Sequence, residues 1–188
     1  MNNPKCFIVS TALFALWAGL VWYVFNTPKY QFIESSILKG NILITIDKFG
    51  IGSIKASTRE SANFGLGYLH AKDRLLQIYV SKFFSTGTLS ENLGSDFIEA
   101  DKTILNFRFD ENINFVYDHL EANDRKALDS YVNGVNEYVN NLFFLPLEFY
   151  LMGLTKSSLP VFTVKDVIAI YKIITFSMSS QWNLIPLR

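Results

Sequence analysis

The sequence predicts an α+β protein that is mostly α-helical, with a transmembrane helix at the N-terminus and a short β-hairpin before the helices. Three observations carry this prediction. Residues 6–25 form an uncharged apolar run. Residues 42–46 alternate β-branched side chains with a period of two, which is typical of a strand. From residue 57 onward, apolar side chains recur every three or four positions, which is typical of helices.

The composition narrows the classes of protein that the chain can belong to. Its 188 residues are enough for one domain with a core, and a hydrophobic share of 49% argues against disorder. The formal net charge is zero, so we expect no nucleic-acid partner. Cys6 is the single cysteine, which excludes an internal disulfide and a Cys-x-x-Cys zinc site. Two histidines are too few for a His-rich metal site.

The apolar run at residues 6–25 contains no charge and no proline. About 20 apolar residues cross a bilayer core as a helix. The run ends in aromatic residues such as Trp22 and Tyr23, which suit the membrane interface better than a peptidase site. We therefore favour an uncleaved signal-anchor over a cleaved signal peptide. This predicts a membrane-anchored protein of the secretory pathway or cell surface, with an anchor at 1–30 and a domain at 31–188.

The elements after the anchor are predicted in order. A polar linker at 26–36 precedes a hairpin, whose strands lie at 42–46 and 54–56 on either side of an Asp/Gly-rich turn at 47–52. A helix then begins near Ser57 or Thr58, with Glu60 placed to complete a capping box. Two apolar stripes predict that this helix is mostly buried. One is Phe64, Tyr68, Ala71, Leu75 and Ile78, and the other is Leu66, Leu69, Leu76 and Val80.

The remaining chain predicts further helices joined by loops. Residues 85–94 form a loop with one helical turn, and residues 96–120 form two short helices. An amphipathic helix follows at 121–142, then a short apolar element at 145–154 and a loop at 155–163. Thr163 caps a last helix, with Asp166 at its third position.

The sequence contains no motif that would form a complete active site by itself. There is no Gly-x-Ser-x-Gly elbow and no phosphate-binding Gly-x-Gly-x-x-Gly loop. His70 lies beside apolar residues, which favours a structural role, and His119 lies at the solvated end of a helix. The acidic residues between 96 and 110 are interpreted as loop and cap residues rather than as metal ligands.

Asp73 and Arg74 interrupt the middle of the buried helix with two adjacent charges. Neighbouring positions on a helix do not face each other, so the two side chains are expected to serve different partners. Burying a charge costs several kcal/mol unless it finds a partner. We favour a structural role in which the pair ties this helix to the rest of the fold. A direct role in binding substrate is the alternative.

Several spaced motifs resemble one family. The run FGLGYLHAKDRLLQI at 64–78, followed by TGTLSENLG and an aspartate, is similar to the signature at the start of penicillin amidases. DSYVNGVNEYVNN, the LPLEFYLMGL segment and ITIDKFGIGSIKAS resemble later and earlier motifs of that family in the same order, over residues 42 to about 183. The motif positions are Gly65, Gly67, Asp73, Arg74, Gln77, Glu91, Gly94, Asp101, Gly134 and Asn136.

The resemblance implies an N-terminal-nucleophile hydrolase of αββα fold, made as a precursor that cuts itself into an α and a β chain. The N-terminal serine of the β chain attacks linear amides, with its own α-amino group as base. This sequence covers only the α part, so it predicts no catalytic residue and a β-chain-like partner. Thr175, Met178 and Ser179 are expected to line the acyl pocket for an acyl-amide small molecule.

Three departures from the family pattern qualify these expectations. Gly52 and Ser53 stand where the family usually has Pro-His, which predicts an altered turn. No carboxylate stands near Ile185, where the family holds calcium, so no cofactor is expected. The chain also stops before the expected nucleophile. It is therefore expected to be inactive alone, and a non-catalytic, membrane-anchored degenerate paralogue acting as a scaffold or binding module is the alternative. A helical membrane protein unrelated to hydrolases is a third.

Overall fold

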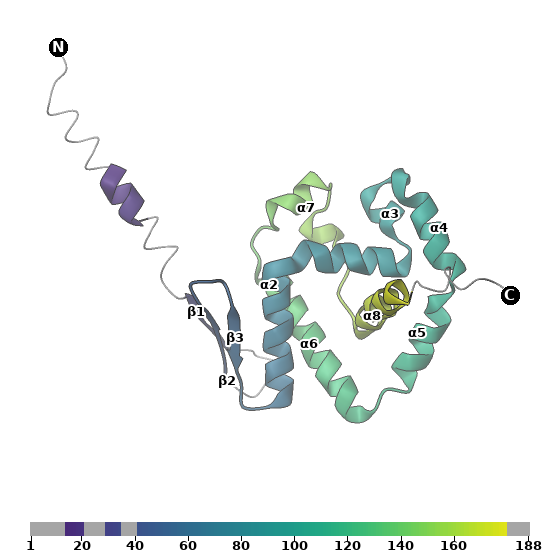
Figure 1. Ribbon diagram of the computed structural model, residues 1–188, viewed down its shortest axis with the longest axis horizontal. Helices are drawn as coiled ribbons and strands as arrows, with labels where there is room; N and C mark the ends of the chain where they lie inside the picture. Colours follow the sequence, from purple (N-terminus) through teal and green to yellow (C-terminus); the bar gives the residue numbers. More distant parts are fainter. Residues whose placement is uncertain (1–13, 21–28, 35–40, 180–188) are drawn as a thin grey trace, which may run out of the picture. The chain divides into compact units, whose positions relative to one another are not determined.

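The computed structural model describes residues 14–20, 29–34 and 41–179 (Figure 1). The chain divides into two units, residues 1–56 and residues 57–188. In the first unit, residues 14–20 are helical and expose Phe14, Leu16 and Trp17. No helix within the described ranges is long and apolar enough to cross a membrane. Most of the predicted anchor at 6–25 lies outside those ranges, so it stays a prediction.

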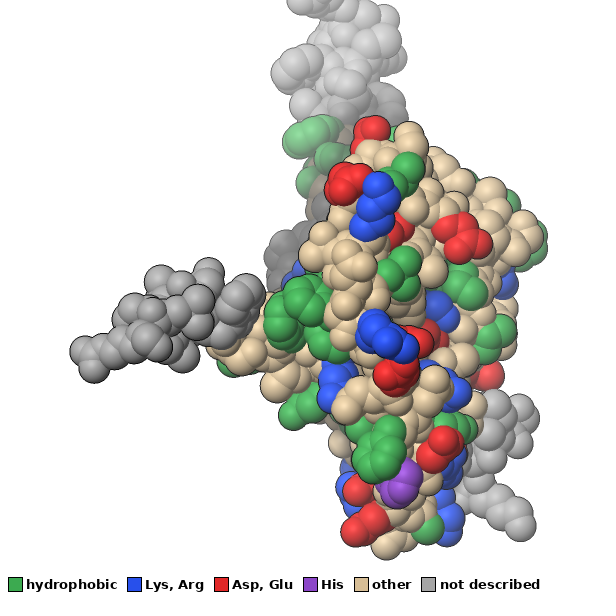
Figure 2. Space-filling model, turned by 90° about the vertical axis from the view of Figure 1, so that its right-hand side faces the viewer, with side chains coloured by type: hydrophobic (Ala, Val, Ile, Leu, Met, Phe, Trp, Pro, Cys, Tyr) green, Lys and Arg blue, Asp and Glu red, His purple; other side chains and the backbone are tan. Residues whose placement is uncertain are grey.

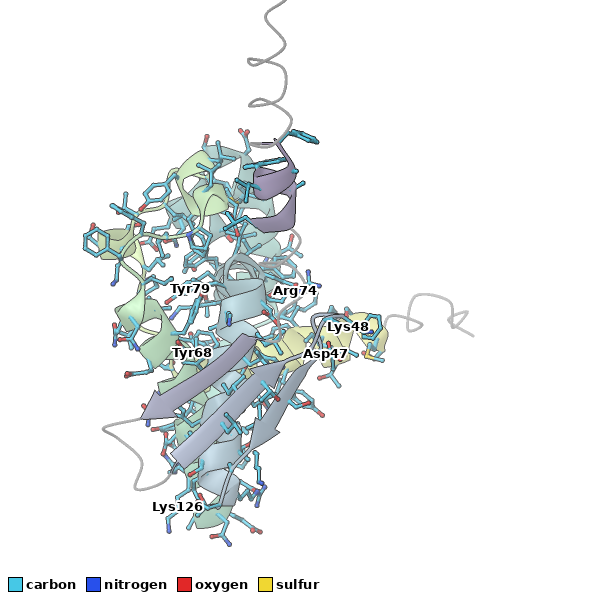
Figure 3. The ribbon with its side chains drawn as sticks, turned by 90° about the vertical axis from the view of Figure 1, so that its left-hand side faces the viewer. Asp47, Lys48, Tyr68, Arg74, Tyr79 and Lys126 are labelled. Carbon is cyan, nitrogen blue, oxygen red and sulfur yellow. The ribbon has the colours of Figure 1, made fainter. Side chains whose placement is uncertain are left out.

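A three-stranded antiparallel sheet completes the first unit, in the order β1 (Lys29–Glu34), β2 (Asn41–Ile46) and β3 (Gly52–Lys55) (Figure 3). The predicted hairpin is confirmed as β2 and β3. Its turn is closed by the Asp47 carboxylate, which accepts hydrogen bonds from the backbone N–H of Phe49 at 2.8 Å and of Ile51 at 2.9 Å. Gly50 adopts a φ of 81°, which a turn of this kind favours in glycine.

The predicted linker at 26–36 is partly wrong, because residues 29–34 form strand β1. This strand pairs antiparallel with β2, and Lys29 lies opposite Ile46. The segment KYQFIE alternates polar and apolar side chains only from Lys29 to Phe32, and four residues are a weak signal for a strand. The pairing with β2 therefore decides its conformation, as tertiary context often does for short strands.

The second unit is helical. Its helices, in order, are α2 (Arg59–Thr86), α3 (Leu89–Leu93), α4 (Ile98–Asn106), α5 (Phe109–Asp118), α6 (Ala122–Asn141), α7 (Leu147–Leu151) and α8 (Val164–Met178), with short 3-10 turns η1 (Ser95–Phe97) and η2 (Lys156–Ser158). This order confirms the predicted succession of helices. α2 packs most extensively against α6, and α8 contacts α2, α5 and α6.

The core of this unit is built from the apolar stripes that the sequence contains. Four of the five residues of the first stripe, from Phe64 to Leu75, are buried. In the second stripe Leu69 is buried, whereas Leu66 is exposed and Leu76 and Val80 are half-buried. α2 is thus buried mainly on one side. The other side remains open over part of its length.

Side-chain caps fix where the long helices begin. Thr58 accepts a hydrogen bond from the Ser61 backbone N–H at 3.0 Å and starts α2. The Thr58 hydroxyl also donates to the Ser61 hydroxyl at 2.9 Å, so Ser61 rather than Glu60 is the partner. Thr163 and Asp166 form the predicted capping box at the start of α8. Gly87, with φ 65°, ends α2 in the left-handed conformation that favours glycine.

Candidate functional site

The glycines of the signature motifs allow two helices to touch through their backbones. A Cβ added at Gly67 would lie 2.0 Å from the carbonyl oxygen of Tyr131, and one added at Gly134 would lie 2.0 Å from that of Phe64. No side chain fits at such distances. Gly65 is also buried in α2. The glycines at 67 and 134 therefore set the crossing of α2 and α6, which positions everything else in the unit.

Asp101 organises the loop after α2. Its buried carboxylate accepts hydrogen bonds from the backbone N–H of Leu89 at 2.9 Å and of Ser90 at 2.7 Å, and from the Ser90 hydroxyl at 2.5 Å. Burial alone would raise the pKa of this carboxyl, but the hydrogen bonds outweigh it and lower the pKa below its ordinary value of 3.8. Asp101 on α4 thus caps the N-terminus of α3.

The other two motif residues in this loop, Glu91 and Gly94, are exposed. Glu91 lies in the first turn of α3, where a negative charge is favourable, and Gly94 follows the helix at φ 112°. Asn136 has a structural role on α6. Its side-chain amide donates to the carbonyl of Phe162 at 2.8 Å and accepts from the N–H of Phe162 at 3.0 Å, so α6 holds the segment that leads into α8.

A buried ion pair that the sequence reasoning missed joins α2 to α8. Lys82 Nζ lies 2.8 Å from the carboxylate of Asp166 and donates to the Val161 carbonyl at 2.9 Å. Tyr79 donates its hydroxyl to the Pro160 carbonyl at 3.2 Å. Burial, and then the negative charge of Asp166, raise the pKa of Tyr79 to about 12. In the sequence, a buried partner for Lys82 could have been expected from its position, because Lys82 lies seven residues after Leu75 on the buried stripe.

Arg74 lies at a kink in α2. Its backbone is non-helical, with φ −140° and ψ 33°, and its side chain is exposed. Among the described residues it takes part in no hydrogen bond or ion pair. Asp73 is also exposed, and its charge contributes to raising the pKa of Tyr138 after burial and Tyr68. The link that we predicted between Arg74 and the rest of this chain is therefore not formed in the described part.

A groove runs beside Arg74, and Arg74 and Tyr79 leave α2 on different sides (Figure 3). The volume of this groove, here the Arg74 groove, is about 420 Å³. Its polar wall comes from α2 and α6 and its apolar wall from the segment before α8 and from α8 itself. The lining residues are His70, Arg74, Gln77, Ile78, Ser81, Tyr131, Phe162, Val167, Ile170 and Ile174.

The two histidines have structural neighbours. His70 Nδ1 lies 3.2 Å from the Tyr131 hydroxyl, and burial raises the pKa of Tyr131. His119 ends α5, where its Nδ1 lies 2.8 Å from the Phe115 carbonyl and its ring stacks on that of Phe115. Neither histidine is hydrogen-bonded to a serine or threonine in the described part of the chain. These contacts agree with the structural and helix-end roles predicted for them.

The C-terminal part of α8 exposes a face made of Tyr171, Ile174, Thr175 and Met178, which we call the α8 face. Met178 is 80% exposed. The hydroxyls of Thr175 and Ser179 donate to carbonyls of their own helix, at Tyr171 and Phe176. The predicted pocket residues Thr175, Met178 and Ser179 are thus grouped on the last turn, and their assignment to an acyl pocket stays a prediction.

In the described residues, neither a patch of one charge nor a group of metal ligands marks another candidate site. Side chains of both signs are interspersed on the face of the molecule shown in Figure 2, without a field of one sign. Across the described residues, no three His, Cys, Asp or Glu side chains are grouped so that they could hold a metal ion. The position near Ile185, on which the calcium prediction depends, lies outside those residues.

Comparisons with known proteins identify the class. The profile described as Penicillin amidase matches residues 41–188. Penicillin G acylase from Escherichia coli is 29% identical over 160 residues, which cover 82% of this chain and 18% of that protein. Penicillin acylase 2 proenzyme from Pseudomonas sp. (strain SE83) is 32% identical over 116 residues, 62% of this chain and 15% of that protein.

An acyl-homoserine lactone acylase from Pseudomonas syringae pv. tomato is 32% identical over 105 residues, 54% of this chain and 13% of that protein. Thermostable penicillin G acylase from Alcaligenes faecalis shares the fold, with a TM-score of 0.63 at 20% identity over 86% of this chain and 77% of that chain. The chain belongs to the penicillin amidase family and corresponds to its α-chain region. It spans less than a fifth of the length of these curated relatives.

Proposed function

We propose that this chain is the α-chain-like part of a hydrolase of linear amides, and that it is inactive until a β part joins it. One observation supports this best. The Arg74 groove and the α8 face expose apolar side chains and a guanidinium that has no partner among the described residues, whereas every buried side-chain polar atom in that part of the chain is hydrogen-bonded. Such a surface suits a protein partner, because aromatic residues and arginine are enriched in interfaces.

The chemistry would reside in the partner. The family resemblance implies an N-terminal serine whose hydroxyl attacks the amide carbonyl carbon while its α-amino group takes the proton. That proton then leaves with the amine, and water releases the acid from the acyl-serine. In this chain, Thr175, Met178 and Ser179 would form one wall for the acyl group. Because the thioether of Met178 is flexible, this wall would accept apolar acyl groups of varied shape.

We further propose that residues 6–25 anchor the chain to a membrane of the secretory pathway or at the cell surface. This rests on the length of the uncharged run, which matches the thickness of a bilayer core. No calcium or other cofactor is proposed, since no carboxylate stands near Ile185.

The test of the hydrolase proposal uses the full chain from its own cells. An affinity-tagged copy is extracted in mild detergent, and its companions are identified by mass spectrometry and N-terminal sequencing. We expect a companion that begins with serine, and hydrolysis of a panel of chromogenic N-acyl anilides by the complex. The purified chain alone should show no turnover above buffer. Turnover by the chain alone would refute its proposed inactivity.

The alternative is a non-catalytic, membrane-anchored degenerate paralogue that acts as a scaffold or binding module. Two departures from the family pattern motivate it, namely Gly52 and Ser53 in place of the usual Pro-His and the lack of a carboxylate near Ile185. The same extraction separates the two proposals. Companions that lack an N-terminal serine, in a complex without amidase activity, would favour the scaffold.

A further inference from the structure

The chain between α6 and the end of α7 exposes a second set of apolar side chains, none of which belongs to the α8 face. Phe143 is 87% exposed and Leu151 is 79% exposed. Phe144, Leu147 and Tyr150 are also exposed, and we call these five residues the α7 patch. The rings of Phe143 and Phe144 contact each other edge to face, with centroids 4.7 Å apart. Leu147 and Leu151 are one helical turn apart and share a face of α7.

Buried neighbouring residues and hydrogen bonds fix the backbone that carries the α7 patch. Leu145, Phe149 and Leu154 are buried in the core of the unit. The side chain of Lys156 donates to the carbonyls of Asn140 at 3.0 Å and of Leu142 at 2.6 Å, which closes the C-terminal end of α6. The exposed side chains are therefore presented on a fixed base. Their exposure does not come from a frayed segment.

The chemistry of this patch differs from that of the α8 face. Between residues 142 and 155 the only charged side chain is Glu148. The α8 face has Lys172 among its neighbours in sequence and the Arg74 groove beside it, which offers a partner protein charges and hydrogen bonds. The α7 patch offers almost none, and its residues do not line the Arg74 groove. A protruding, nearly uncharged cluster of Phe and Leu suits the acyl boundary of a lipid layer.

We propose that the α7 patch inserts into the membrane interface, as a second point of contact in addition to the anchor proposed at 6–25. This inference depends on the proposed anchoring, because a tethered domain remains next to a bilayer. The two phenylalanines and two leucines would lie among the upper acyl chains, with the Tyr150 hydroxyl among the headgroups. Glu148 predicts a preference for zwitterionic over anionic lipid.

The test uses the full chain in phosphatidylcholine vesicles. Cys6 is replaced by serine, which removes the single cysteine, and an environment-sensitive fluorophore is placed at Phe144→Cys. The matched control carries the same label at Phe115→Cys, an exposed phenylalanine of the same unit on α5, and the ribbon shows helix α5 apart from α7 (Figure 1). Flotation of the vesicles reports anchoring. Quenching by nitroxide-labelled lipids reports insertion of each site, and iodide in the buffer reports exposure to water.

We expect the protein to float with the vesicles and the label at 144 to be quenched by nitroxide lipid at least about twofold more than the label at 115. Flotation with equal quenching at the two sites would overturn the insertion of the patch and leave the anchor intact. Shielding of site 144 from iodide without lipid quenching would identify a protein occupant and also overturn it. Failure to float would overturn the anchor, and the insertion with it.

Discussion

The crossing of α2 and α6 and the outer surface of α8 belong to one helical unit, but the first is closely packed and the second is exposed. At the crossing, Gly67 and Gly134 let backbones touch, and each helix contributes buried side chains to one core. On the outer surface of α8, Ile174 and Met178 are exposed, and Arg74 of α2 is exposed in the groove that Ile174 also lines. The first region is made from buried contacts within this chain, whereas the second exposes apolar side chains and an arginine, which are residue types common in protein interfaces.

This difference separates two kinds of motif residue. Gly67, Gly134, Asn136 and Asp101 all have contacts within the chain that account for their residue type. Arg74 has no such partner in the described residues. Substitutions in the first group should therefore change the stability of the chain itself, while a substitution at Arg74 should change only what the chain can bind.

The largest effect is expected at the helix crossing. Gly134→Val should lower the free energy of unfolding by about 3 kcal/mol or more, because the new Cβ would collide with the backbone of Phe64 on α2. Denaturant titration followed by circular dichroism measures this change. Asp129→Val on the exposed side of α6 is the control and should cost less than about 1 kcal/mol. Equal stability of the two variants would contradict the close crossing.

A slightly smaller loss is expected when the buried ion pair is broken. Lys82→Ala should destabilise the chain by about 3 kcal/mol, since it leaves the Asp166 carboxylate buried without its cation. Lys102→Ala removes the cation of an exposed pair with Glu99 and should change the free energy of unfolding by less than about 1 kcal/mol. Thermal unfolding of the two variants makes the comparison. Similar melting temperatures would show that the buried Lys82 pair stabilises the chain no more than the exposed Lys102 pair does.

The cap at α3 should give an intermediate effect that depends on pH. Asp101→Asn is expected to cost about 1–2 kcal/mol at neutral pH, because a neutral amide accepts these hydrogen bonds more weakly. Hydrogen bonding lowers the pKa of Asp101, so its contribution is present above its ordinary value of 3.8 and is lost as pH falls through the lowered pKa. The difference in stability between the two proteins should therefore shrink as pH falls below 3.8 and vanish below the lowered pKa, as acid titration would show.

The sequence predicted the scaffold well where local chemistry decides the structure. The Thr163–Asp166 capping box and the spacing of Phe64, Tyr68 and Leu75 are local signals, and all are found as expected. The partner of Lys82 could not be predicted, because Asp166 lies 84 positions away and only the packing of α8 on α2 joins them. Strand β1 was missed because the alternation from Lys29 to Phe32 is short, and its pairing with β2 depends on residues outside the strand.

Arg74 changed most between sequence and structure. Its place in a predicted buried helix favoured a structural link, and Arg74→Leu would then have damaged folding. Because the side chain is exposed at a kink, we now expect Arg74→Leu to change the free energy of unfolding by less than about 0.5 kcal/mol. It should weaken partner binding about tenfold or more, which quantitative pull-down measures. A large loss of stability with unchanged binding would reverse this assignment.

The central claim is that the α8 face is an interface for a β part, and a photo-crosslinker tests it most directly. A benzophenone amino acid replaces Tyr171 on the α8 face in the full chain, and Phe115 on α5 in a control. After irradiation in the source cells, the site at 171 should yield one covalent adduct with a chain that begins with serine, and the site at 115 should not. Adducts at 171 that match those at 115, or none at all, would contradict the account.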